Sequence, residues 1–158
     1  MFLGSLFSMN SSSMQTLKMA HESASASQLL QQRIEALRIA NWHQITYDAN
    51  YLKNPIYPKP ADPLNPTFTH QLDVDAPGSA TLKTVSEEVT LVPYGSSTTG
   101  NIKLTRANGV TTIVNNQSLL TESAVKVIWT VTYVGSPNDH LLTRQAVAIL
   151  AKGGVAKW

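Results

Sequence analysis

The chain has 158 residues, of which 42% are hydrophobic, so it is long enough for one domain and short for two. Its formal net charge of +2, with only 14% charged residues, is too weak and too scattered to attract nucleic acid or an acidic membrane surface, and no nucleic-acid partner is predicted. The absence of cysteine excludes disulfides, thiolate metal sites and cysteine nucleophiles.

The first nine residues are mostly apolar. This stretch is well below the roughly 20 residues that a helix needs to cross a bilayer. It also lacks the basic start and the clear small-residue cleavage site of a signal peptide. Taken by themselves, the residues present are therefore expected to be soluble.

Residues 5 to about 40 are predicted to form one long helix. Good helix formers dominate this segment, and it contains neither glycine nor proline, although its serines weaken the preference. The first half has an apolar stripe, and the second half follows the i, i+4, i+7 rule. The residues of the two stripes are Leu3, Phe7, Met14 and Leu17, followed by Leu30, Ile34 and Leu37.

Between the stripes, residues 20–27 carry mostly small side chains, among them Ala24, and the backbones of two helices could approach closely there. At about 1.5 Å per residue the helix would be roughly 54 Å long, whereas a compact chain of this size has a radius of gyration of about 15 Å. Part of the helix should therefore extend beyond the domain. The alternative is two helices broken near the serines.

Lys18 and Glu22 are spaced for an ion pair on this helix, although the Lys-to-Glu order is the weaker orientation.

Residues 42–66 hold five of the eight prolines and three tyrosines, Tyr47, Tyr51 and Tyr57. This composition predicts an irregular connector that wraps around the domain. Its aromatic rings are expected on the surface or against the helix. A ligand-binding aromatic patch is the alternative.

From residue 68 onward the patterns favour β structure. The clearest strand alternates apolar residues on one face with Lys126, Ile128, Thr130 and Thr132 on the other. We predict that the apolar residues form the core of a sheet. They are Val125, Val127, Trp129, Val131 and Tyr133.

A turn cluster at residues 135–139 separates this strand from a partner at Leu141–Ala151, which predicts a C-terminal hairpin. Asn108-Gly109 lies between two β-prone runs and predicts a second hairpin, since this dipeptide favours the positive φ angles of tight turns. Residues 67–74 and 87–93 are further candidate strands, with a turn between them at residues 76–79.

The predicted fold class is therefore α+β, with a long N-terminal α-helix packed on a C-terminal antiparallel β-sheet. Leu30, Ile34 and Leu37 provide the helix stripe that one face of the sheet can cover. We divide the chain into an N-terminal helix (residues 1–41), a Pro/Tyr-rich connector (42–66) and a sheet domain (67–158).

The sequence contains no recognisable catalytic motif and no metal-ligand spacing. The histidines lie on separate predicted elements without metal-ligand spacing, and no Gly-x-Ser-x-Gly turn frames a nucleophile. Asp73 and Asp75 could supply oxygen ligands to Ca²⁺, but they lack the spacing of an EF-hand, and solvated aspartates at a strand end are favoured. We expect no catalytic residue, cofactor or metal. The four histidines are His21, His43, His70 and His140.

Ser27–Arg38, followed by Asn41-Trp42, resembles the second half of the N-terminal helix in prepilin-like proteins, the type IV pilins and type II secretion pseudopilins. Arg144–Ala151, followed by residues 152–155, resembles the last strand of such subunits. The order of helix, irregular connector and antiparallel sheet is that of the pilin fold.

The resemblance implies a non-enzymatic, structural subunit of a type IV pilus or a type II secretion pseudopilus, which assembles through its N-terminal helix. Its partners would be other pilin or pseudopilin subunits, and its location the periplasm, the cell envelope or an extracellular filament of a bacterium. The residues expected to pack in assembly are Leu3, Phe7, Met14, Leu17, Ala24, Leu30, Ile34 and Leu37.

The sequence departs from the family at its start. The family's processing site is a glycine followed by Phe-Thr-Leu and a Glu at the fifth mature position, and the hydrophobic run that follows it anchors the subunit in the inner membrane. Both are absent here, although Leu3, Leu6, Phe7 and Met9 resemble the tail of that run. The inner membrane is therefore expected as a partner only through a segment of this kind.

Two other classes of function remain open at this point. The chain could be a periplasmic or extracellular binding module that holds a peptide or a glycan with the Tyr/Pro connector and a sheet edge, which an exposed aromatic cluster would favour. An enzyme is the third class, and it would need a pocket with two or more convergent titratable side chains.

Overall fold

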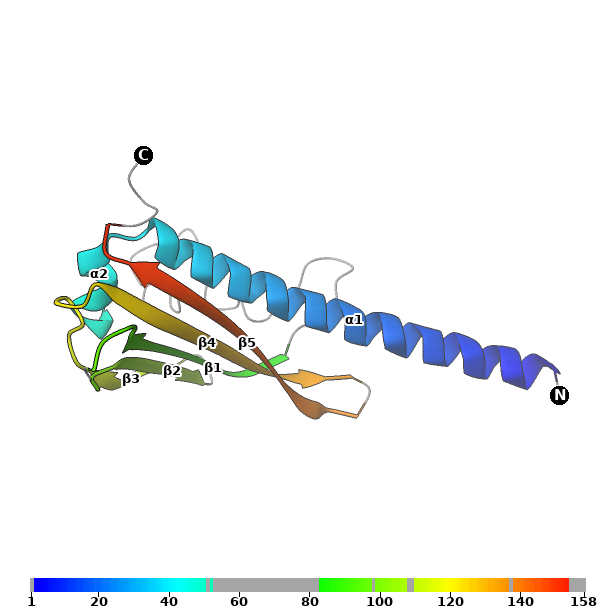
Figure 1. Ribbon diagram of the computed structural model, residues 1–158. Helices are drawn as coiled ribbons and strands as arrows, with labels where there is room; N and C mark the ends of the chain where they lie inside the picture. Colours follow the sequence, from blue (N-terminus) through cyan, green and yellow to red (C-terminus); the bar gives the residue numbers. More distant parts are fainter. Residues whose placement is uncertain are drawn as a thin grey trace, which may run out of the picture.

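The computed structural model describes residues 2–50, 52, 83–97, 99–107, 110–136 and 138–153. A long helix precedes a five-stranded antiparallel sheet with the strand order β3-β2-β1-β4-β5 (Figure 1), which confirms the predicted α+β class. The elements are α1 (Phe2–Ile39), α2 (Trp42–Thr46), β1 (Lys83–Pro93), β2 (Ile102–Ala107), β3 (Val110–Asn116), β4 (Ala124–Gly135) and β5 (His140–Ala151).

Helix α1 runs without a break through its serine-rich middle, so the alternative of two helices is wrong. Serine and threonine inside a helix can satisfy their hydroxyl groups by donating to the carbonyl oxygen four residues earlier. Thr16 Oγ1 donates to the carbonyl oxygen of Ser12 at 3.0 Å, and Ser27 Oγ donates to that of Ser23 at 3.0 Å. These bonds explain how the helix accommodates a run of residues with modest helix propensity.

The prediction that residues 42–66 form an irregular connector is wrong for their first part, which is the short helix α2. Its start has a capping box: the side chain of Asn41 accepts from the backbone N–H of His43 at 2.9 Å, and that of Gln44 accepts from the backbone N–H of Asn41 at 3.0 Å. Reciprocal capping of this kind stabilises a helix start, so the Asn-x-x-Gln spacing was the signal for it.

Several sequence predictions fall outside the described residues. These are the remainder of the connector from residue 53 onward, together with Tyr51, the candidate strand at 67–74 and the turn at 76–79. The structure describes the domain from Lys83 onward.

The C-terminal strands follow the predicted pattern closely. The strand predicted around residues 125–133 is β4, and its predicted partner is β5, paired antiparallel over twelve residues from Gly135–His140 to Ala124–Ala151. Ala107 lies opposite Val110 at the end of the antiparallel β2–β3 pair, as the predicted second hairpin requires, while Asn108 and Gly109 themselves lie outside the described residues. The candidate strand at 87–93 begins earlier, at Lys83, as the central strand β1.

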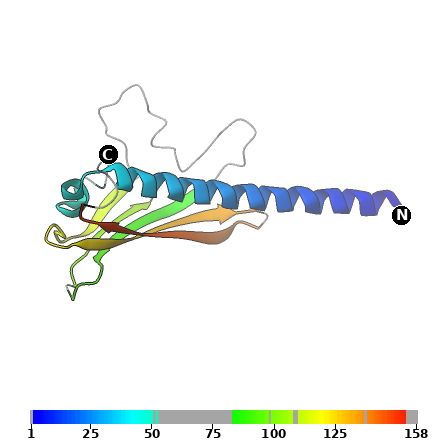
Figure 2. The same ribbon diagram turned by 45° about the horizontal axis from the view of Figure 1, so that its top comes forward.

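One face of the sheet is covered by the C-terminal half of α1, as Figures 1 and 2 show from two directions. The core between them includes all five residues predicted for the sheet core, which are 0% exposed. Alternate residues of β4 are buried because side chains on a strand point to opposite faces. The buried apolar residues are Ala26, Leu29, Leu30, Ile34 and Leu37 of α1, Ile45, Ala49 and Leu52 near α2, and Val89, Leu91, Ile102, Leu104, Leu119, Val125, Val127, Trp129, Val131 and Tyr133 of the sheet and its loops.

Candidate functional site

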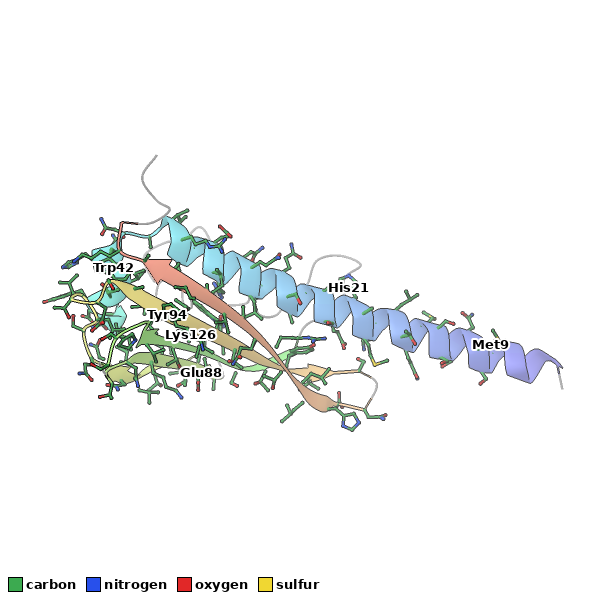
Figure 3. All side chains as sticks on the ribbon, in the orientation of Figure 1. Met9, His21, Trp42, Glu88, Tyr94 and Lys126 are labelled. Atoms are coloured by element: carbon green, nitrogen blue, oxygen red, sulfur yellow. The ribbon has the colours of Figure 1, made fainter. Side chains whose placement is uncertain are left out.

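The N-terminal half of α1 extends beyond the sheet, and every residue from 7 to 21 is exposed. We call residues 7–21 the overhang. Figure 3 shows the side chain of Met9 projecting from it with no strand beside it, and Met9 is 72% exposed. The predicted packing residues Phe7, Met14 and Leu17 are 75%, 67% and 70% exposed, and the side chain of Leu3 is not among those described.

The large apolar residues of the overhang do not all lie on one side of the helix. Phe7, Met14 and Leu17 lie on a different side from the sheet-facing residues of α1, whereas Met19, which is 40% exposed, lies on the same side as Leu37. Successive residues turn by about 100° around a helix axis, which places the stripe of Phe7, Met14 and Leu17 about 140° from the line of Ala26, Arg33 and Leu37. The second set faces the sheet. The stripe of the overhang therefore points largely away from the side on which the sheet lies.

Ala24 prolongs this stripe, since it follows Leu17 at i+7 and is exposed. Beyond Ala24 the same side of the helix carries exposed Gln28 and Glu35, and then Ile39, which is 82% exposed at the end of the helix. Leu30, Ile34 and Leu37, which the sequence placed in the same assembly set, are buried against the sheet instead. The seven predicted packing residues whose side chains are described thus lie on two surfaces, an external stripe and the internal core. We refer to Phe7, Met14, Leu17 and Ala24 as the overhang stripe.

Polar contacts fix α1 where it meets the tip of the β4–β5 hairpin. Glu22, only 2% exposed, accepts from the backbone N–H of Ser136 at 2.9 Å and from its Oγ at 2.8 Å. Nearby, Arg144 Nη2 donates to Ser23 Oγ at 2.6 Å. The carboxylate of Glu22 thus binds the hairpin tip rather than forming the predicted pair with Lys18.

This clamp can be tested at Glu22. We expect Glu22→Ala to lower the free energy of unfolding by about 1–3 kcal/mol, because the change leaves the polar groups of Ser136 without their acceptors in a partly buried place. The amide proton of Ser136 should also exchange faster with solvent. Lys18→Ala, one turn earlier on the exposed overhang, should leave both measurements unchanged, and equal effects of the two variants would contradict the role of Glu22.

A buried ionic cluster connects α1 to the middle of the sheet. Glu87 of β1 is 0% exposed, and its Oε1 accepts from Arg33 Nε at 3.0 Å and from Trp129 Nε1 at 2.7 Å. Arg106 of β2, 4% exposed, places Nη1 3.6 Å from Glu87 Oε2. One carboxylate therefore holds a helix residue and residues of two neighbouring strands in a single arrangement.

The sequence reasoning missed this cluster. Glu87 shares the strand parity of Val89 and Leu91, which was a signal for a charged residue on the buried face. Such a position requires a partner, because an unpaired buried charge is strongly unfavourable. The sequence did not show which cationic side chains pair with Glu87, because this depends on how α1 and β2 pack against β1.

The described residues contain no group of three or more His, Cys, Asp or Glu side chains placed to hold a metal ion. His21, His43 and His140 lie on α1, α2 and β5, and His70, Asp73 and Asp75 fall outside the described part of the chain. Tyr47 is 56% exposed and stacks on His43 with ring centroids 4.7 Å apart, while Tyr51 and Tyr57 are not described.

None of the helices in the described part of the chain is both long enough and apolar enough to span a bilayer. Comparison with models of known protein families, with curated proteins and with solved structures gives no match to this chain.

Proposed function

We propose that this protein is a structural subunit of a filament of the type IV pilus or type II secretion pseudopilus kind, and that it assembles through α1. Its partners in this proposal are other subunits of the same kind, and its place is the periplasm, the cell envelope or an extracellular filament. Its activity is assembly rather than catalysis.

The observation that carries the proposal is the orientation of the overhang stripe. Phe7, Met14 and Leu17 are large apolar side chains with 67–75% exposure, on the side of the helix that points away from the sheet. An apolar surface of this kind is stabilised when another apolar surface covers it. Copies that bury their stripes against one another would gather the helices at the centre and direct their sheets outward, which is the arrangement of a filament with a helical core.

Charged substitutions on the stripe test this proposal. We expect Leu17→Glu to weaken self-association by about ten- to a hundredfold, since burial of a leucine side chain contributes about 1.5–3 kcal/mol and each 1.4 kcal/mol corresponds to a factor of ten. Sedimentation over a range of concentrations measures the association, and electron microscopy of the concentrated protein shows whether the assemblies are filaments. The far-ultraviolet circular dichroism should not change, because the side chain is exposed in the single subunit.

Gln15→Glu is the matched control. Gln15 lies two residues before Leu17, is also exposed, and points about 160° away from it around the helix. It introduces the same charge on the other side of the overhang and should leave association unchanged. A wild-type chain that stays monomeric at all concentrations, or equal effects of the two variants, would refute assembly through this stripe.

A further inference from the structure

Strand β5 forms one edge of the sheet, and no other strand of the described residues pairs with its outer side. Natural edge strands are usually guarded by proline, lysine, a β-bulge or a covering element, because an open row of N–H and C=O groups pairs readily with another chain. β5 contains neither proline nor lysine, and its register with β4 runs over all twelve residues without a shift. It is therefore a long edge without proline, lysine or a β-bulge to guard it.

The single arginine of β5 does not guard the edge either. Arg144 donates through Nη2 to Ser23 Oγ of α1 at 2.6 Å, so its charge is directed toward the helix. Farther along the strand, Val147 and Ile149 are 53% and 52% exposed. The second half of the edge is thus apolar and uncharged up to Ala151.

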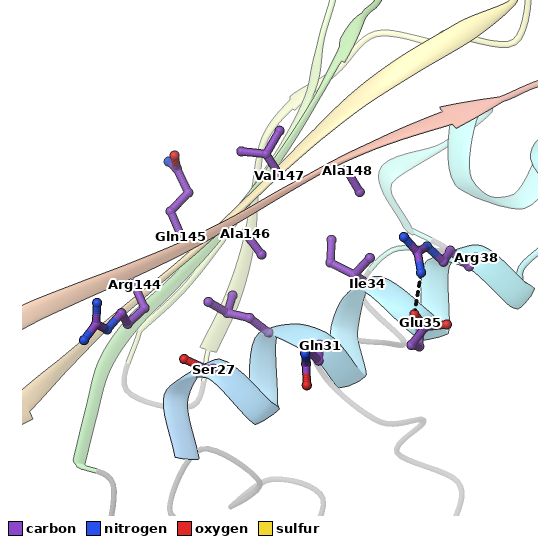
Figure 4. Close-up of a pocket in the computed structure, with 11 residues that line it drawn as sticks. Ser27, Gln31, Ile34, Glu35, Arg38, Arg144, Gln145, Ala146, Val147 and Ala148 are labelled. Carbon is purple, nitrogen blue, oxygen red and sulfur yellow. Dashed lines mark hydrogen bonds and ion pairs between the residues drawn. The ribbon is translucent and has the colours of Figure 1, made fainter. Parts of the chain in front are cut away.

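A groove with a volume of about 370 Å³ follows this edge. Five consecutive residues of β5, 144–148, line it together with Ser27, Gln31 and other residues of α1. Figure 4 shows Gln145 and Val147 pointing away from α1, and Ala146 and Ala148 pointing toward it. Side chains from both faces of β5 line the groove, so the backbone of this strand borders it. The space between β5 and the helix stays open because Ala146 and Ala148 have small side chains.

The opposite edge of the sheet is β3, which is uncharged like the second half of β5. Its seven residues, Val110–Asn116, contain no Lys, Arg, Asp or Glu, and Val110 and Val114 are 65% and 56% exposed. Every pair of neighbouring strands is antiparallel. β3 and β5 are four strands apart and therefore run in the same direction. Two copies in the same orientation can thus bring β3 of one beside β5 of the other as a parallel pair.

We propose that β5 of one copy accepts β3 of a second copy as a parallel neighbouring strand, so that the sheets of successive subunits join edge to edge. A contact between two different surfaces of identical subunits can repeat without closing. This inference rests on the proposed function, because it requires that both copies have the same orientation. In a filament, subunits are related by rotation about one axis and translation along it, so all of them point the same way. The competing arrangement pairs β5 with β5 about a two-fold axis, which directs the overhangs in opposite directions and ends at a dimer.

Disulfide cross-linking tests the pairing. Because the chain contains no cysteine, only the introduced cysteines can form a disulfide. Thr112→Cys is introduced in one preparation and Gln145→Cys in another, both on the sheet face away from α1. We expect a disulfide-linked dimer when the two are mixed under mild oxidation, and little from either alone. Thr143→Cys and Val147→Cys cover the neighbouring registers, because cysteines whose Cα atoms are more than about 7 Å apart do not form a disulfide.

A lysine on the edge provides the matched comparison. Val147→Lys, combined with Thr143→Cys or Gln145→Cys, should lower the yield of the mixed dimer by about tenfold, because edge lysines oppose strand addition. Thr90→Lys places the same charge on the same face of the central strand β1, which pairs with β2 and β4 but not with β5, and should leave the yield unchanged.

Three results would overturn the inference. The first is the absence of a mixed dimer in all three registers. The second is that Gln145→Cys alone forms a disulfide-linked dimer as efficiently as the mixture does, which would indicate a β5–β5 pair. If either occurs while Leu17→Glu still weakens association, the proposed function stands and only the edge pairing fails. The third is a wild-type chain that does not associate at all, in which case both fail.

Discussion

Replacement of Glu87 by alanine is expected to lower the free energy of unfolding by about 3–5 kcal/mol, because it removes one partner of a buried ionic cluster. Two guanidinium groups, those of Arg33 and Arg106, and the indole N–H of Trp129 lose this carboxylate in a place where Glu87 is 0% exposed. Such a loss is a large fraction of the 5–15 kcal/mol that usually stabilises a domain. Urea unfolding followed by far-ultraviolet circular dichroism measures it.

Glu88→Ala is the control for this variant. Glu88 is the next residue of β1, points to the other face of the sheet and pairs with Lys103 at 3.0 Å while its side chain is 42% exposed. Exposed pairs of this kind contribute about 0–1 kcal/mol. If Glu87→Ala does not fold, Glu87→Gln retains an acceptor and the side-chain volume and should still be less stable than Glu88→Ala. Equal stability of the Glu87 and Glu88 variants would show that the cluster does not hold α1 to the sheet.

Leu37→Ala is expected to cost about 2–5 kcal/mol of unfolding free energy, since it opens a cavity where the end of α1 packs on the sheet. Leu37 is 1% exposed and belongs to the same core as Trp129 and Leu52. Neighbouring side chains can only partly fill the space of the missing atoms, and the cost depends on how far they relax. Thermal and urea unfolding of the purified variant test the value.

Ile39→Ala provides the comparison on the same turn of the helix. Ile39 is 82% exposed, and its loss should change stability by no more than about 0.5 kcal/mol, with some gain from the higher helix propensity of alanine. A loss at Ile39 as large as that at Leu37 would mean that the helix face we assign to the core is wrong.

The elements that could be predicted from the sequence are those with a long, regular local pattern. The strict alternation from Val125 to Tyr133 predicted β4, because successive side chains of a strand point to opposite faces and the apolar face is buried. The absence of glycine and proline between Ser5 and Asn54 predicted a long helix for similar local reasons. The second helix, α2, escaped prediction because five residues are too few for a periodic signal, and the prolines that follow it dominated the composition.

The buried cluster was not predictable in the same way. A charged residue usually lies on the surface, so Arg33 gave no sign that it faces the core. Only the packing of α1 against the sheet brings it within 3.0 Å of Glu87, which follows it by 54 positions in the chain. Long-range pairs of this kind depend on how whole elements meet, and no local window contains that information.

The sequence by itself determined the helix, the alternating strands and the order in which they follow one another, because periodicity and the preferences of single residues act over a few positions. The tertiary structure decided which apolar residues of α1 became core and which became external surface. The sheet covers only one side of the helix and ends near Glu22, so Leu30, Ile34 and Leu37 are buried while Phe7, Met14 and Leu17 stay exposed on a different side. Apolar residues of one helix therefore form the core in one half and an exposed surface in the other, because the sheet extends along only one half of α1.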